Sequence, residues 1–140
     1  MGFEDSVTYY KSYNFAIRIV KLYQYLQSEH KEFVLSKQLL RSGTSIGALI
    51  REAKYAQSKA DFINKLSIAL KEANETQYWI DLLYDTSYLS QKMYDSIKSD
   101  SKELIKLLVA SIKTLNRVIC YFLLATYYLK KEQKCLSQYQ

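Results

Sequence analysis

A chain of 140 residues, 49% of them hydrophobic, is long enough to bury the core of one domain. It has no proline and only three glycines, which excludes a loop-rich or collagen-like chain and favours helices throughout. The formal net charge is +6, and from Lys98 onward eight basic residues stand against three acidic ones. The positive charge is therefore concentrated in the last third of the chain, which favours an anionic partner.

The first helix is predicted over residues 6–28. Its apolar residues Phe15, Ile19, Leu22 and Leu26 recur at intervals of four, three and four, which places them in one buried stripe. The polar residues 29–32 that follow are interpreted as the first connection.

The second helix is predicted over residues 33–57 and holds both internal glycines. Its core line is Leu35, Leu39, Ser42, Ile46, Leu49 and Ala53. Gly43 and Gly47 border this line, so they permit a neighbouring helix to come close, which would offset their poor helix propensity. We expect this neighbour to be the third helix, whose middle is rich in small residues. A break at Ser42-Gly43 between two shorter helices is the alternative to one continuous helix.

The third helix is predicted over residues 59–85. Ser58 is a suitable N-cap, and Asp61 follows it at the position that often completes such a cap. The stripe expected to be buried is Phe62, Leu66, Ala69, Ala73, Thr76 and Ile80.

The fourth helix is predicted over residues 91–130, with Ser90 as its cap and residues 131–140 as a polar tail. Its core line alternates three- and four-residue steps, as in a left-handed bundle. That line is Ile97, Leu104, Leu108, Ser111, Leu115, Val118 and Phe122. Residues 1–140 are thus predicted to form a single all-α domain, an up-down four-helix bundle.

A basic stripe is predicted on the far side of the fourth helix. It consists of Lys98, Lys102, Lys106, Lys113 and Arg117. A face that is merely solvated and a face that binds nucleic acid are both compatible with this pattern. Lys37 and Arg41 are weaker candidates for nucleic-acid binding. Because the sequence has no base-reading loop or aromatic RNA-binding motif, binding would follow shape and the phosphate backbone.

After Arg117 the fourth helix becomes apolar on every side, which a small soluble monomer cannot easily bury. We therefore expect a homo-oligomer whose interface includes Cys120, Tyr121, Leu124, Tyr127 and Tyr128. The uninterrupted apolar tract 118–129 is shorter than the stretch of about 20 residues that crosses a bilayer. No membrane partner is predicted.

No residue set indicates catalysis. His30 is the only histidine and lies in a polar segment, and neither Cys120 nor Cys135 has a histidine near it in the sequence. The carboxylates Glu52, Glu72, Glu75 and Asp81 are expected to form salt bridges, because the Glu-x-x-His repeat of di-iron bundles is missing. The sequence predicts no enzyme, no metal and no cofactor. Two cysteines without a disulfide pattern and a polar N-terminus predict a cytoplasmic location.

The stretches 39–53 and 58–76, followed by Tyr78-Trp79, are specific enough to identify a family. Together they resemble the bacterial four-helix-bundle family of 23S rRNA intervening-sequence proteins, also called the S23 family. The similarity runs from about Lys11 to Leu124. Leu49 departs from the asparagine that many members carry at this position, whereas Glu52 keeps the pattern.

The resemblance implies an up-down four-helix bundle that assembles as a homopentamer and is not an enzyme. It also implies kinship with the accessory protein of diversity-generating retroelements, a basic pentamer that binds nucleic acid and a reverse transcriptase. The function predicted is therefore binding of RNA, other nucleic acid or a nucleoprotein partner through basic helix surfaces. The alternative is a protein-interaction scaffold that binds no nucleic acid.

Overall fold

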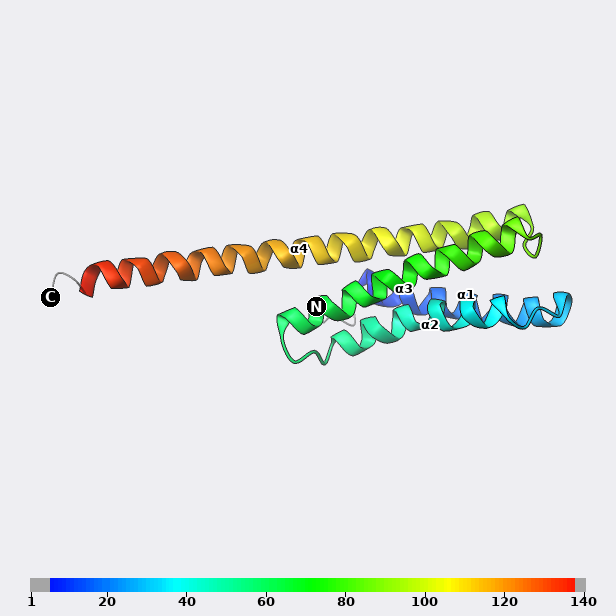
Figure 1. Ribbon diagram of the computed structural model, residues 1–140, viewed down its shortest axis with the longest axis horizontal. Helices are drawn as coiled ribbons and strands as arrows, with labels where there is room; N and C mark the ends of the chain where they lie inside the picture. The colour runs from blue at the N-terminus through cyan, green and yellow to red at the C-terminus, as the bar shows by residue number, and fades with distance from the viewer. Residues whose placement is uncertain (1–5, 138–140) are drawn as a thin grey trace.

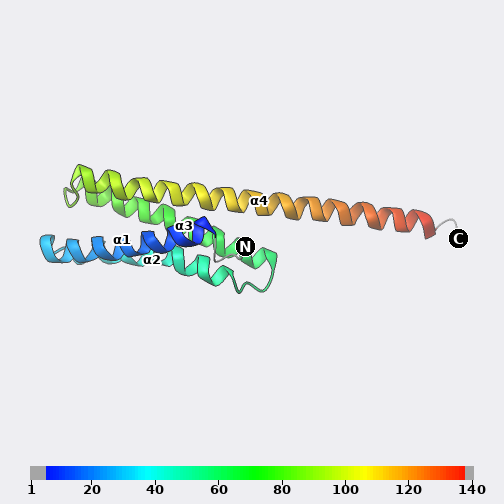
Figure 2. The same ribbon diagram turned by 180° about the vertical axis from the view of Figure 1, so that it is seen from behind.

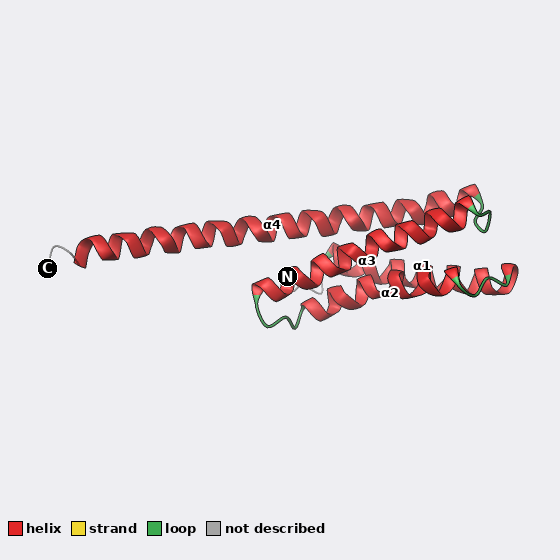
Figure 3. Cartoon of the chain, in the orientation of Figure 1, coloured by secondary structure: helices red, strands yellow, loops and turns green. Residues whose placement is uncertain are grey.

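The computed structural model describes the backbone of residues 6–137 and the side chains of residues 6–127, 129 and 130. The described chain forms four helices joined by short connections: α1 (Val7–His30), α2 (Leu35–Ala53), α3 (Lys59–Asp85) and α4 (Gln91–Ser137) (Figure 3). Each helix packs on the next, and α4 returns to contact α1 (Figure 1). The prediction of an all-α protein with four helices in up-down order is confirmed.

The helices differ greatly in length. α4 has 47 residues, whereas α1, α2 and α3 have 24, 19 and 27. At 1.5 Å per residue α4 is about 70 Å long, so it continues well beyond its neighbours, as both ribbon views show (Figures 1 and 2). The part of α4 after Leu115, residues 116–137, is called the α4 overhang below. The prediction that this helix stops at residue 130 was wrong, because residues 131–137 are helical too.

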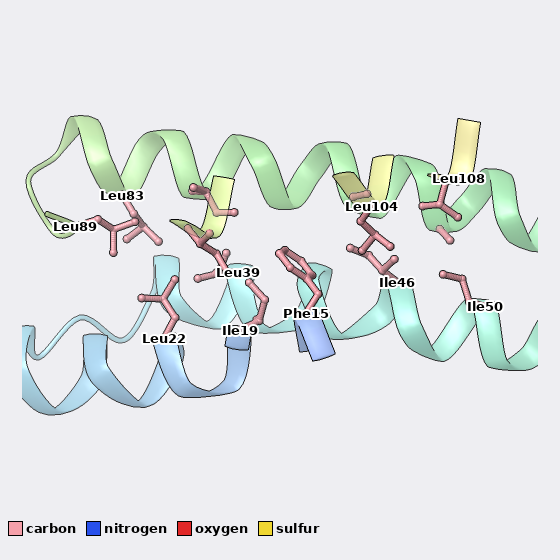
Figure 4. Packing of buried hydrophobic residues seen from close by; sticks show 14 of the residues in the cluster. Phe15, Ile19, Leu22, Leu39, Ile46, Ile50, Leu83, Leu89, Leu104 and Leu108 are labelled. Carbon is pink, nitrogen blue, oxygen red and sulfur yellow. The ribbon is translucent and has the colours of Figure 1, made fainter. Parts of the chain in front are cut away.

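The core lies where all four helices run side by side (Figure 4). The predicted stripe of α1 is buried in full, and in α3 every predicted residue is buried except Phe62, which is half-buried. In α2 the buried line is rotated slightly, so that Ile50 is fully buried and Leu49 only partly. In α4 the predicted line is correct in register, but Val118 and Phe122 are exposed. They lie beside the start of α3, where Val118 lines a groove with Phe62 and Lys59 Nζ is 5.3 Å from the centre of the Phe122 ring.

The connection between α1 and α2 lies two residues later than predicted, at residues 31–34, since α1 continues to His30. Lys31 then adopts a left-handed conformation with φ 51°, and the Glu32 N–H donates to the Leu26 carbonyl at 3.1 Å. The Glu32 carboxylate accepts the N–H groups of Val34 (3.1 Å), Leu35 (2.8 Å) and Ser36 (2.6 Å). This buried carboxylate therefore caps the start of α2, which begins at residue 35 and not 33.

The connection between α2 and α3 begins earlier than predicted. α2 ends at Ala53, and the next three N–H groups donate to carbonyls three residues back in tight turns, which replaces the predicted helix to residue 57. The start of α3 is confirmed. Ser58 Oγ accepts the Asp61 N–H at 3.1 Å, and Asp61 Oδ2 accepts the Gln57 N–H at 3.1 Å.

The two internal glycines lie in one continuous helix, so the predicted break at Ser42-Gly43 does not occur. Their close neighbour is α1, however, and not α3 as predicted. A Cβ built on Gly43 would lie 2.8 Å from Ile19 Cγ1, and one on Gly47 would lie 3.4 Å from the Ser12 backbone oxygen. Apolar periodicity identifies the buried side of α2. It does not show whether α1 or α3 packs against Gly43 and Gly47.

Gly43→Ala is expected to destabilise the bundle. The added methyl overlaps Ile19, and overpacking of this kind costs about 1–3 kcal/mol, against which alanine regains about 1 kcal/mol of helix propensity. Urea denaturation should show a lower free energy of unfolding. The loss in Gly43→Ala/Ile19→Ala should be smaller than the sum of the losses in the two single variants, because alanine at residue 19 removes the overlapping Cγ atoms. Gly47→Ala is the matched control and should be neutral or stabilising, because its Cβ meets only ordinary contacts.

Glu32→Gln is expected to weaken the start of α2 and to change the pH dependence of stability. Burial alone would raise the pKa of Glu32, but the hydrogen bonds from the Leu35, Ser36 and Val34 N–H groups together hold this pKa below its ordinary value. The carboxylate therefore stabilises the fold fully above its unfolded pKa of about 4.3, and the contribution is lost as the pH falls through the folded value.

Urea denaturation at neutral pH should show the Glu32→Gln variant to be less stable by about 1 kcal/mol. Below about pH 4.3 the difference between the variant and the parent should shrink. The control is Glu29→Gln, which replaces an exposed carboxylate two residues before the left-handed Lys31. It should leave the free energy of unfolding nearly unchanged both at neutral pH and at low pH. Equal behaviour of the two variants would contradict the capping role.

Candidate nucleic-acid-binding surface on α4

Four basic side chains occupy the outer side of α4, away from α1 and α3. They are Lys102, Lys106, Lys113 and Arg117, all exposed, and are called the α4 basic face below. Their helical positions span about 22 Å along the axis. None of the four takes part in an ion pair with another described side chain. From Leu104 to Lys131 the sequence contains no acidic residue. The α4 basic face is therefore an uncompensated strip of positive charge.

The acidic residues nearest to this face are neutralised by α1. Lys11 Nζ lies 2.8 Å from a Glu103 carboxylate oxygen, and the Arg18 guanidinium pairs with Asp100 and donates to Ser96 Oγ at 2.7 Å. These contacts join α1 to α4 along the edge of the bundle. Because they occupy both carboxylates, they leave the charge of the α4 basic face unopposed.

Lys98 was predicted to belong to the same stripe, but it has a different environment. Its ammonium group donates to both carboxylate oxygens of Asp81 at 2.6 and 2.8 Å, and lies 6.0 Å from the centre of the Tyr94 ring. The Lys98 side chain is only 13% exposed. Tyr94 also donates to Asp81, which raises the pKa of Tyr94. The structure thus places Lys98 in an α3–α4 contact and not on the α4 basic face.

The weaker candidates Lys37 and Arg41 lie on α2, which contacts α1 and α3 but not α4. Arg41 is held by two carboxylates of α3, at 3.3 Å from Glu72 and in a direct hydrogen bond to Glu75. The hydrogen bonds that Glu75 receives from Arg41 and Trp79 lower its pKa. Lys37 is exposed. The structure does not bring these two residues together with the α4 basic face.

A second cluster of basic residues was missed from the sequence. Arg18 and Lys21 of α1 and Lys92 of α4 line a groove of about 390 Å³ with an apolar floor that includes Leu22 and Met93. The two helices supply residues more than 70 positions apart in the chain, so no local pattern could have identified the groove.

The residues predicted to form an oligomer interface lie on the α4 overhang. Cys120, Tyr121, Leu124 and Tyr127 are exposed, whereas the side chain of Tyr128 lies outside the described residues. By length and composition α4 also qualifies as a candidate membrane span over Gln91–Tyr127, with a mean hydropathy of 1.6 in its most apolar 18-residue window. Within the described residues, no group of three or more His, Cys, Asp or Glu side chains could hold a metal ion.

The fold and this surface define a small all-α protein with an up-down four-helix core and a basic, then apolar, fourth helix. Residues 4–110 match the 23S rRNA-intervening sequence protein family, and the chain belongs to that family. It is similar to a crystal structure from Bacteroides thetaiotaomicron VPI-5482, a protein with unknown function from the S23 ribosomal protein family. The two chains are 64% identical, with a TM-score of 0.76 and coverage of 76% of this chain and 99% of that one. A comparison with curated proteins gives no match.

The family match divides α4. It includes Lys102 and Lys106 but ends at residue 110, so Lys113, Arg117 and the whole α4 overhang lie beyond it. Half of the α4 basic face therefore belongs to the shared bundle, and the other half belongs to the part of α4 that the family match does not include.

Proposed function

We propose that the protein is a non-catalytic, cytoplasmic, homo-oligomeric bundle that binds RNA through the α4 basic face. The observation that carries this proposal is that no described carboxylate pairs with the positive charges of the α4 basic face. Four exposed cations follow one side of a helix, and the nearest carboxylates, Asp100 and Glu103, are already paired with α1. The family name refers to 23S rRNA, which makes RNA the class of nucleic acid we favour. The resemblance to basic pentamers makes a pentamer the expected assembly.

The chemistry of this face favours phosphate contacts over base recognition. Residues 102–117 contain no aromatic side chain on which a base could stack. Lysine ammonium groups on flexible stems attract phosphates as point charges, and a strip about 22 Å long can follow several nucleotides of a backbone. Binding should therefore be strong at low salt, weakly sequence-dependent and steeply salt-dependent.

A second candidate function is a scaffold for a protein partner, such as a reverse transcriptase. It is favoured by a row of apolar side chains on the outer side of α1. Tyr10, Tyr13, Ile17 and Val20 are 56%, 54%, 40% and 37% exposed. A partner protein could cover this row while the lysines of α4 remain solvated, and RNA binding would then be weak and non-specific.

Lys102→Glu/Lys106→Glu is expected to weaken RNA binding at least tenfold, because it reverses two of the four charges. Fluorescence anisotropy with a single-stranded RNA of about 30 nucleotides, between about 50 and 200 mM salt, measures the effect. If four phosphates are contacted, the logarithm of affinity should fall with the logarithm of salt at a slope of about −3 per chain. The variant should lose about 1.4 of that slope.

The matched control is Lys59→Glu/Lys71→Glu, which changes the net charge equally but on exposed positions of α3. It should leave the salt slope unchanged and weaken binding only slightly. Equal losses in both double variants would mean that only the net charge matters. A flat salt dependence of the parent chain would favour the scaffold.

A further inference from the structure

The groove of about 390 Å³ between α1 and α4 has an apolar floor. It lies near the end of the bundle where α1 ends and α4 begins (Figure 1). Leu22 and Ile97 on this floor are only 8% and 3% exposed, and Met93 beside them is half-buried. The half-buried ring of Tyr25 lines the groove as well. Because a methionine side chain is flexible and polarisable, this floor can adapt to an apolar side chain laid against it.

Arg18 joins the two walls of the groove. Its guanidinium donates to the Ser96 carbonyl at 3.3 Å and to Ser96 Oγ at 2.7 Å, and it pairs with Asp100. These contacts bridge α1 and α4, so the groove is already formed in the folded bundle and binding does not have to open it. The charge of Arg18 is neutralised by Asp100 and is not the one that attracts a ligand.

Two lysines on opposite walls carry the unopposed charge. Lys21 of α1 and Lys92 of α4 are exposed, and neither forms an ion pair with another described side chain. None of the described residues that line the groove is acidic. An apolar floor thus lies between two cations. The complementary ligand is apolar along its middle and negative along both edges.

An amphipathic helix with acidic edges has this pattern. Its apolar residues at i, i+4 and i+7 lie on one side, and aspartate or glutamate can border that side on both flanks. From Arg18 to Tyr25 the α1 wall is about 10 Å long, or two helical turns, which is the length that three such anchors need. The groove is open to solvent along its length, so a small molecule would keep much of its surface in water. An RNA backbone has no apolar group to cover the floor.

A second copy of this chain does not supply such a helix. Six described carboxylates already form ion pairs within the chain: Glu52, Glu72, Glu75, Asp81, Asp100 and Glu103. The carboxylate of Glu32 is buried at the start of α2. Among the described helices, none presents an apolar row with unpaired carboxylates on both sides. The complementary helix therefore belongs to another protein.

We propose that this groove binds an acidic amphipathic helix of a partner protein. The apolar side chains of that helix cover Leu22, Met93 and Ile97, and its carboxylates meet Lys21 and Lys92. The groove faces α1, whereas the α4 basic face lies on the outer side of α4, so the inference does not rest on RNA binding. All residues of the groove fall within the part of the chain that matches the family.

The test measures the fluorescence anisotropy of labelled synthetic peptides mixed with the full chain at about 150 mM salt. The probe has about 18 residues, long enough to form a helix. It carries leucine at i, i+4 and i+7, glutamate at the bordering positions and alanine elsewhere. The probe should bind at least about tenfold more tightly than a peptide with lysine in place of glutamate, and than one with alanine in place of leucine.

Variants of the chain locate the binding. Lys21→Glu/Lys92→Glu should weaken binding of the glutamate peptide at least about tenfold and should bind the lysine peptide instead, because the charge pattern is reversed. Met93→Ser leaves the charge unchanged and should weaken binding about fivefold through the floor. Lys59→Glu/Lys71→Glu is the matched control for net charge and should bind within about twofold of the parent. Circular dichroism verifies that each variant remains helical.

Several results would overturn the inference. One is a glutamate peptide that binds no more tightly than about 1 mM, and another is equal weakening by the two double variants. Displacement of the peptide by an equal concentration of dodecanoate would assign the groove to a small amphipathic anion. A fall in the mass of Lys21→Glu/Lys92→Glu, measured by light scattering, would make the groove a contact between copies.

The same measurements separate this inference from the proposed function. Absence of peptide binding with RNA binding intact would remove the helix-binding groove alone. Loss of the salt slope in RNA binding, with the glutamate peptide still bound through Lys21 and Lys92, would remove the proposed function and leave the groove standing.

Discussion

The feature on which the rest of the structure depends is the mismatch in length between α4 and the helices it packs against. α1 and α3 have 24 and 27 residues, so they cover only the first half of a helix of 47. That first half is anchored by Leu104 and Leu108 in a four-helix core and by the ion pairs of Asp100 and Glu103 with α1. The second half extends beyond the bundle as a single helix, on which the described side chains of Tyr121, Leu123 and Leu129 are exposed.

A lone helix of this kind is marginal in water, since helices gain most of their stability from packing one side against a partner. The composition of the overhang favours a surface that a partner covers, because its large apolar side chains are unfavourable when exposed to water on a free helix. The α4 basic face extends from the shared bundle into this uncovered part. The charge that we propose binds RNA and the apolar surface that we propose for assembly thus lie on one helix, on different sides of it.

The sequence predicted what depends on periodicity along one element. It identified the four helices, the buried stripes of α1 and α3 and the register of α4, because apolar residues recur with the period of the helix. It could not predict which neighbouring helix a given side chain contacts. The glycine flank of α2 faces Ile19 of α1 and not α3. Lys98 pairs with Asp81, a residue of another helix, and so does not join Lys102 on the α4 basic face. Nor does any local pattern identify Glu32 as a cap, since its role depends on the fold of the connection.

Amide hydrogen exchange across residues 116–130, measured over a range of protein concentrations, tests the two-part description of α4 most directly. If the overhang is a packed assembly segment, its amides should be protected at high concentration and lose protection on dilution, while those near Leu104 remain protected. Fast exchange across residues 116–130 at every concentration, or protection that persists in a single chain, would contradict it.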